Sequence, residues 1–183
     1  MKKILLSMLL AIVLFFSFST PAYAKARMDI VRKGGFTTLS DEDMQDTIQS
    51  LCDAICKDCN VQAKQTISCY DWEGSNVLAY NTLYGCNIIC VNLTGFRTTK
   101  DADAVGETVE YHLVKTIAHE VRHSYQWEHQ NDDTDYGRAC KLGFTTYQDY
   151  NGNRSLYYKQ FIEADAEEYA IKYADKFFKI RRK

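Results

Sequence analysis

The sequence predicts one domain of the α+β class, in which a small sheet is accompanied by helices. Apolar residues recur at helical spacing in three segments, over residues 39–59, 107–128 and from 155 onwards. Between the first two of these segments, three short stretches are rich in Val, Ile, Thr and Tyr and are separated by turn residues. Helices and strands that occur in separate runs, rather than in strict alternation, favour an α+β arrangement.

The first 24 residues have the layout of a secretory signal peptide. "MKK" is a short basic start, "ILLSMLLAIVLFFSF" is an apolar run, and "STPAYA" ends in a small-x-small pattern. The apolar run has about 15 residues, whereas roughly 20 are needed to cross a bilayer. We therefore expect cleavage after Ala24, a secreted mature domain of residues 25–183, and no membrane anchor after cleavage.

The charge of the predicted mature chain argues against one class of partner. Cleavage removes Lys2 and Lys3 but no acidic residue, which leaves 20 basic residues against 24 acidic ones and changes the formal net charge from −2 to −4. A mildly acidic protein is a poor candidate for general nucleic-acid binding. The mature chain, at about 159 residues, is long enough for one hydrophobic core.

Seven cysteines follow the predicted cleavage site, and in an exported protein most of them are expected to form disulfides. They are Cys52, Cys56, Cys59, Cys69, Cys86, Cys90 and Cys140. Three bridges would leave one thiol unpaired, and the spacing does not fix the pairing. The alternative is a structural zinc site formed by Cys56, Cys59, Cys86 and Cys90.

The first helix is expected to begin after Ser40 and to extend to Cys59. Ser40 is a suitable N-cap, and Asp43 lies in an acidic first turn that complements the helix dipole. Its apolar face consists of Met44, Ile48, Leu51 and Ile55. The lead-in before this helix is expected to be short and irregular.

Three strands are expected next, within residues 61–70, 75–84 and 86–94. The connections "DWEGS" and "YG" between them contain turn residues. The following segment, 95–106, is polar and is expected to be a loop.

Two helices are expected in the C-terminal half. The first covers residues 107–128, and its apolar stripe consists of Leu113, Ile117, Val121 and Tyr125. A polar segment, 131–154, is expected to be a loop. The last helix begins near Ser155, and its apolar face consists of Ile162, Ala166, Tyr169, Tyr173 and Phe177.

The segment "HEVRH" on the second of these three helices indicates a metal site. His119 and His123 are four residues apart, so both imidazoles leave the same helix face and could chelate Zn²⁺. Glu120 is rotated from this face by one residue, where it could take a proton from a zinc-activated water. The pattern is among the more informative short motifs because each residue type has a function at its position.

Three residues could supply the third protein ligand. Glu163 lies in "FIEADAEEYA" on the last helix, where the small side chains of Ala164, Ala166 and Ala170 suit close packing of two helices. His129 has metzincin-like spacing, but Gln126 stands where those enzymes have a helix-breaking glycine, and an unbroken helix carries His129 about 9 Å beyond His123. His112 lies roughly 10 Å before His119 along the axis. Glu163 is the expected ligand.

"HEVRH" followed by "EADA" resembles the gluzincin division of the zincin metallopeptidases, over roughly residues 75–170. The resemblance implies a compact zincin-like domain that binds one zinc ion. It implies that His119, His123 and Glu163 are the ligands and that Glu120 is the general base.

The resemblance also implies supporting features of the site. Asp165 or Glu167 would orient a ligand imidazole; thermolysin-like enzymes have an aspartate at the position of Glu167. The strand at 87–92 would be the edge strand nearest the HEVRH helix and would pair with an extended peptide. Tyr150 or Tyr157 would stabilise the transition state.

The expected function is therefore that of a secreted zinc metallopeptidase acting on peptides or proteins. Two alternatives remain open at this point. One is a zinc-dependent hydrolase of a non-peptide substrate such as a cell-wall amide. The other is a disulfide-stapled binding module with only structural zinc, which has no use for Glu120.

Overall fold

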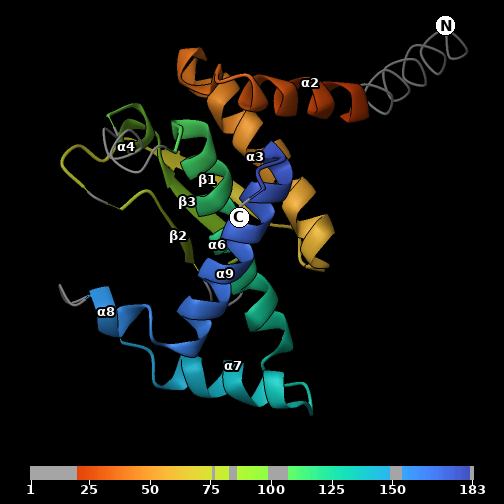
Figure 1. Cartoon of the computed structure of the whole chain (residues 1–183), viewed down its shortest axis with the longest axis vertical. Helices are drawn as coiled ribbons and strands as arrows, with labels where there is room; N and C mark the ends of the chain where they lie inside the picture. The colour runs from red at the N-terminus through yellow and green to blue at the C-terminus, as the bar shows by residue number, and fades with distance from the viewer. Residues whose placement is uncertain (1–19, 76, 83–85, 99–106, 149–153, 182–183) are drawn as a thin grey trace, which may run out of the picture.

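A computed structural model describes residues 20–75, 77–82, 86–98, 107–148 and 154–181. In this part of the chain, helices surround one three-stranded sheet, which confirms the α+β class (Figure 1). The helices are α2 (Thr20–Arg32), η1 (Phe36–Thr38), α3 (Asp41–Cys59), α4 (Leu93–Thr98), α6 (Val109–His129), α7 (Asp135–Thr145), α8 (Arg154–Tyr157) and α9 (Phe161–Phe178). The strands are β1 (Thr66–Tyr70), β2 (Ala79–Thr82) and β3 (Ile88–Asn92).

Helix α2 replaces the irregular lead-in that the sequence predicts, and it extends across the predicted cleavage site. Met28 and Val31 are buried in the core. The guanidinium of Arg27 is also buried and donates to the carbonyl of Asp43 at 2.6 Å and to the hydroxyl of Thr47 at 2.9 Å, both on α3. These contacts stabilise α2 by holding its inner face against α3. They join residues distant in the sequence, so the local sequence pattern of α2 does not predict the helix.

The predicted signal segment falls mostly on residues 1–19, which lie outside the described residues. Its cleavage after Ala24 stays a prediction. Among the helices of the described part of the chain, none combines the length and the apolar character needed to cross a bilayer.

Helix α3 follows the sequence prediction closely. The Ser40 hydroxyl accepts a hydrogen bond from the Asp43 amide at 3.2 Å, which confirms the N-cap. The helix ends at Cys59 because Asn60 adopts a left-handed conformation with φ of 62°. The four predicted apolar residues, Met44, Ile48, Leu51 and Ile55, are fully buried.

The sheet has the order β1-β3-β2, with β1 parallel and β2 antiparallel to β3. The expectation that residues 87–92 form an edge strand is therefore wrong, because β3 is central. Ile89, Cys90 and Val91 of this strand are buried and Ile88 is half-buried, as expected for a strand paired on both sides. Strand β2 lies at the edge and contacts α6.

Two segments expected to be loops contain helices. Helix α4 begins directly after β3, and the Asn92 side chain accepts from the Gly95 amide at 3.1 Å. Helix α7 occupies part of the segment 131–154, and the Thr134 hydroxyl caps it by accepting from the Gly137 amide at 2.9 Å. Both helices begin at polar caps within otherwise polar sequence, where the apolar periodicity is weak.

The expected last helix is divided into α8 and α9. The division falls after Tyr157, and α9 begins with Gln160 as its N-cap residue. The Gln160 side chain donates to the carbonyl of Gln148 at 2.8 Å instead of capping α9. This bond joins the start of α9 to the segment after α7.

Helices α6 and α9 make the most extensive contact between elements and lie side by side in Figure 1. Ala166, Ala170 and Ala174 are fully buried at this side of α9, so small side chains allow the two helices to approach closely. Ala164 is exposed, which corrects its expected place in the packed face.

The seven cysteines are free thiols in this structure, which therefore contains none of the predicted disulfides. Cys52 and Cys56 lie one turn apart on α3, with their sulfurs 4.0 Å apart, about twice a disulfide bond length. Within the described residues, no cysteine belongs to a group that could hold a metal ion. The oxidation of these thiols in exported protein stays a prediction.

The α6–α9 contact can be tested with two alanines of α9. Ala170→Leu adds three carbons at a fully buried position and should lower the free energy of unfolding by about 1–3 kcal/mol, because overpacking forces neighbouring side chains apart. Ala164→Leu is the matched control on the exposed side and should change stability by less than about 0.5 kcal/mol. Denaturant unfolding measures both; equal effects would contradict the packing described.

Candidate metal site

Helix α6 carries His119, Glu120 and His123, the three residues of the HEVRH segment that the sequence assigns to the metal site. The Thr108 hydroxyl caps the helix by accepting from the Tyr111 amide at 3.1 Å, and the helix continues without a break to His129. His119 and His123 therefore lie one turn apart on one face, with ring centroids 4.7 Å apart.

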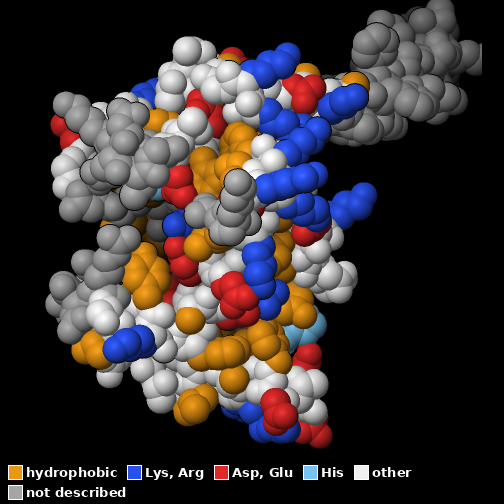
Figure 2. Space-filling view, in the orientation of Figure 1, with side chains coloured by type: hydrophobic (Ala, Val, Ile, Leu, Met, Phe, Trp, Pro, Cys, Tyr) orange, Lys and Arg blue, Asp and Glu red, His pale blue; other side chains and the backbone are white. Residues whose placement is uncertain are grey.

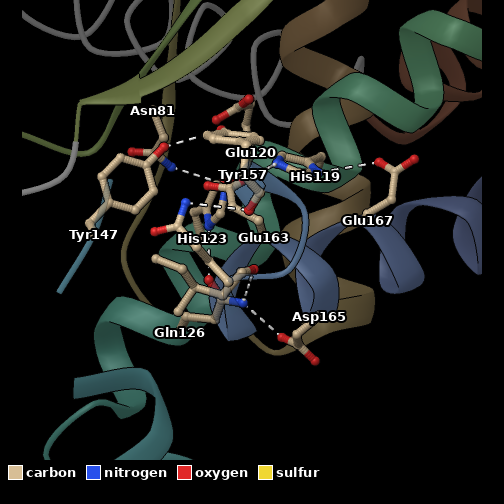
Figure 3. A network of polar contacts seen from close by, with 12 residues as sticks. Asn81, His119, Glu120, His123, Gln126, Tyr147, Tyr157, Glu163, Asp165 and Glu167 are labelled. Carbon is tan, nitrogen blue, oxygen red and sulfur yellow. Dashed lines mark hydrogen bonds and ion pairs between the residues drawn. The ribbon is translucent and has the colours of Figure 1, made fainter. Parts of the chain in front are cut away.

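Helix α9 brings Glu163 to the two histidines (Figure 3). Glu163 stands in the first turn of α9 and only 1% of it is exposed. One carboxylate oxygen lies 3.2 Å from His119 Nε2, and the other lies 3.5 Å from His123 Nε2. The two Nε2 atoms are 3.1 Å apart. Three ligand atoms from two helices thus converge on one point.

This arrangement fits a metal ion. With metal–ligand bonds of about 2.1 Å, tetrahedral zinc ligands are separated by about 3.4 Å, close to the separations observed here. Glu163 Oε2 is buried and is directed at His119 Nε2. The group could therefore hold a metal ion, and two imidazoles with one carboxylate are donors that suit zinc.

The charges of the three groups are strongly coupled. Burial opposes the charged form of His119, but hydrogen bonds to Glu163 and Glu167 raise the pKa of His119 to about 10. Burial and the nearby charge of His119 lower the pKa of His123. Burial disfavours the Glu163 carboxylate, yet the hydrogen bond from His119 lowers the pKa of that carboxyl.

Glu167 is the carboxylate that contacts a candidate ligand imidazole directly. One of its oxygens lies 3.6 Å from His119 Nδ1, and the other lies 2.6 Å from the Lys115 ammonium. Burial alone would raise the pKa of Glu167, but His119 and Lys115 lower that pKa to about 2. A carboxylate on Nδ1 directs the Nε2 atom of His119 towards Glu163.

Asp165 touches neither histidine, although the sequence makes it a candidate for orienting one. It pairs with Arg122 and accepts from the amide group of Gln126, whose carbonyl oxygen lies 2.8 Å from His123 Nδ1. Gln126 was considered in the sequence only as the residue replacing a helix-breaking glycine. Its position three residues after His123 was the available signal for this contact.

Glu120 lies beside the three candidate ligands and faces a cleft of about 480 Å³. The cleft is lined by Val77, Leu78, Ala79, His112, Lys115, Thr116, His119, Glu120, Tyr157, Tyr158 and Glu167. Asn81, on β2, donates to the Glu120 carbonyl at 2.8 Å and to the Ser124 hydroxyl at 2.7 Å. This amide, which sequence reasoning missed, fixes the edge strand on the helix that carries the site.

Of the two tyrosines considered for transition-state stabilisation, Tyr157 lines the cleft and Tyr150 lies outside the described residues. The Tyr147 hydroxyl donates to that of Tyr157 at 3.1 Å. Burial and contacts with Tyr147 and Glu163 raise the pKa of Tyr157, so its hydroxyl is a hydrogen-bond donor at neutral pH.

The other two histidines lie outside the group of candidate ligands. His129 is at the end of α6, where its Nδ1 lies 2.6 Å from a carboxylate oxygen of Asp132. His112 lies two turns before His119, with Nε2 3.5 Å from a Glu107 oxygen. The unbroken helix keeps both away from Glu163, as its geometry predicts.

Comparison of the chain with models of known protein families, with curated proteins and with solved structures finds no match.

Zinc titration of two variants tests the choice of the third ligand. Glu163→Ala should reduce zinc affinity by at least about 100-fold, because it leaves only two protein ligands where zinc sites usually have three or more. His129→Ala should leave affinity within about threefold of the wild-type value. A variant pair with the opposite behaviour would mean that the metal is bound at the other end of α6.

Proposed function

We propose that the protein is a secreted, zinc-dependent hydrolase of peptide bonds. One observation carries this proposal: His119, His123 and Glu163 converge on one point, and Glu120 borders the same cleft. A site that only stabilised the fold would need no additional carboxylate at this position. The proposed export rests on the N-terminal sequence pattern.

The chain's own residues have separate functions in the proposed reaction. A bound zinc ion would supply a Lewis acid that polarises the substrate carbonyl and lowers the pKa of water. Glu120 takes a proton from the attacking water and transfers it to the leaving amine. Tyr157, whose hydroxyl remains protonated, is the proposed donor to the developing oxyanion.

The surroundings of the cleft favour an extended polypeptide as the substrate. One wall consists of residues 77–79, which include the first residue of β2, and β2 is one of the two edge strands of the sheet. An edge strand offers unpaired backbone groups to an extended peptide. We propose β2 for this function, in place of the strand expected from the sequence.

Exposed apolar side chains on the C-terminal helices, of which Tyr158 lines the cleft, support the same substrate class. They lie on α7, on α8 and around the start of α9, where Figure 2 shows hydrophobic side chains gathered on the visible face. They are Leu142, Tyr147, Leu156, Tyr158 and Phe161. This apolar surface suits a substrate that presents apolar side chains around the scissile bond.

Glu120→Gln tests the catalytic assignment. The amide keeps the shape of the side chain but cannot accept a proton, so hydrolysis should fall by about 10²–10⁴-fold while zinc binding is retained. Zinc content and turnover of a peptide library are the measurements. Glu168→Gln, on the exposed side of α9, is the matched control and should keep full activity.

The same assay separates peptides from other amides. Wild-type protein loaded with zinc should cleave library peptides, and a chelator should abolish the cleavage. Turnover by Glu120→Gln at the wild-type rate would contradict its function as general base. Cleavage of cell-wall amides without cleavage of any peptide would contradict the proposed substrate class and indicate a cell-wall amide as the substrate.

A further inference from the structure

We propose that Gln126 is a positioning residue that holds His123 with its proton on Nδ1 and its Nε2 lone pair directed at the metal position. This inference rests on the proposed zinc function and adds a residue to it. The carbonyl oxygen of Gln126 lies 2.8 Å from His123 Nδ1, and the side chain of Gln126 is fully buried. Water therefore does not compete for this contact.

The orientation of the Gln126 amide follows from its other two partners. Its nitrogen lies 2.8 Å from the carbonyl oxygen of Ile162 and 2.8 Å from a carboxylate oxygen of Asp165. A carbonyl and a carboxylate can only accept hydrogen bonds, so both amide protons are used there. The reversed amide would place an oxygen against two acceptors. The oxygen must therefore face His123, and Nδ1 must be the donor.

Asp165 is itself held as an acceptor. Arg122 approaches it with two nitrogens, at 2.8 and 3.0 Å, and the Tyr136 hydroxyl donates to it at 2.9 Å. With three donors directed at it, the Asp165 carboxylate acts as an acceptor towards Gln126. Figure 3 shows Gln126 between His123 and Asp165. The order of contacts is Arg122, Asp165, Gln126 and His123.

The two candidate ligand histidines are thus oriented by different groups. His119 has a carboxylate, Glu167, near its Nδ1, whereas His123 has a neutral amide that transmits the position of a more distant carboxylate. The amide oxygen accepts a hydrogen bond from Nδ1 as a carboxylate would, but it adds no negative charge beside Glu163. Groups that orient metal-binding histidines typically contribute 10–100-fold to metal affinity.

The tautomer is tested directly on metal-free protein labelled with ¹⁵N-histidine. Long-range ¹H–¹⁵N spectra distinguish a protonated Nδ1 from a protonated Nε2, and His123→Gln identifies the signals of His123. We expect a protonated Nδ1 and an unprotonated Nε2. A His123 proton on Nε2 alone would overturn the inference, and this test needs neither bound zinc nor a Gln126 variant that folds.

Zinc affinity tests the consequence of this orientation. Gln126→Met keeps the length of the side chain but offers Nδ1 only a weakly accepting thioether, and its zinc affinity should fall by about 10–100-fold. Tyr111→Phe is the control: it removes a different hydrogen bond between α6 and α9, from the buried Tyr111 to Asp175, and should change zinc affinity by less than about threefold. Thermal melts of both metal-free variants show whether their stabilities are comparable.

The outcomes separate this inference from the proposed function. Unchanged affinity of Gln126→Met would overturn the positioning function while leaving the zinc site intact. Equal losses in Gln126→Met and Tyr111→Phe would also overturn it, since they would show a general effect of loosening the contact between α6 and α9. If wild-type protein bound no zinc, the proposed function would fail, and the spectrum of metal-free protein would still decide the tautomer.

Discussion

The close packing of α9 against α6 is the constraint on which the candidate site depends. The two histidines need only one helix, because a spacing of four residues places them on one face. The carboxylate must come from elsewhere, and Glu163 reaches them only because buried alanines let the axes of two helices approach. The packing of the core and the geometry of the candidate site therefore depend on the same distance between α6 and α9, and a change in that distance would alter both.

Burying polar groups at this contact costs free energy, and partners on α6 offset that cost for two carboxylates of α9. Glu163 is balanced by the imidazoles that it faces, while Asp165, two residues later on α9, is balanced by Arg122 on α6. The Arg122 guanidinium also lies over the rings of Tyr125, Tyr136 and Tyr169. Because the geometry of the Arg122–Asp165 pair is fixed, the pair determines how far α9 is shifted along α6, in addition to any stability it adds.

The features that could be predicted from the sequence are those encoded locally. The cap at Ser40 and the HEVRH face of α6 depend on neighbouring residues, so their positions could be predicted. Glu163 could be selected because His129 lies on an unbroken helix and cannot turn back. The strand order could not be predicted, since it depends on which strands pair across the fold. Helix α7 packs on residues distant in the chain, and so does Gln126 where it contacts Asp165. The spacing of Gln126 from His123 could indicate the contact with His123, but nothing local indicates the contact with Asp165.

Helix α2 has a consequence for the order of events in export. If the chain is cut after Ala24, the bond to be cut lies inside this helix, where backbone groups are already paired and the chain is not extended. Arg27, three residues later, is held in the core by α3. Processing would therefore have to precede the docking of α2 on α3, while this segment is still unfolded. The new terminus would then lie within one helical turn of the buried guanidinium.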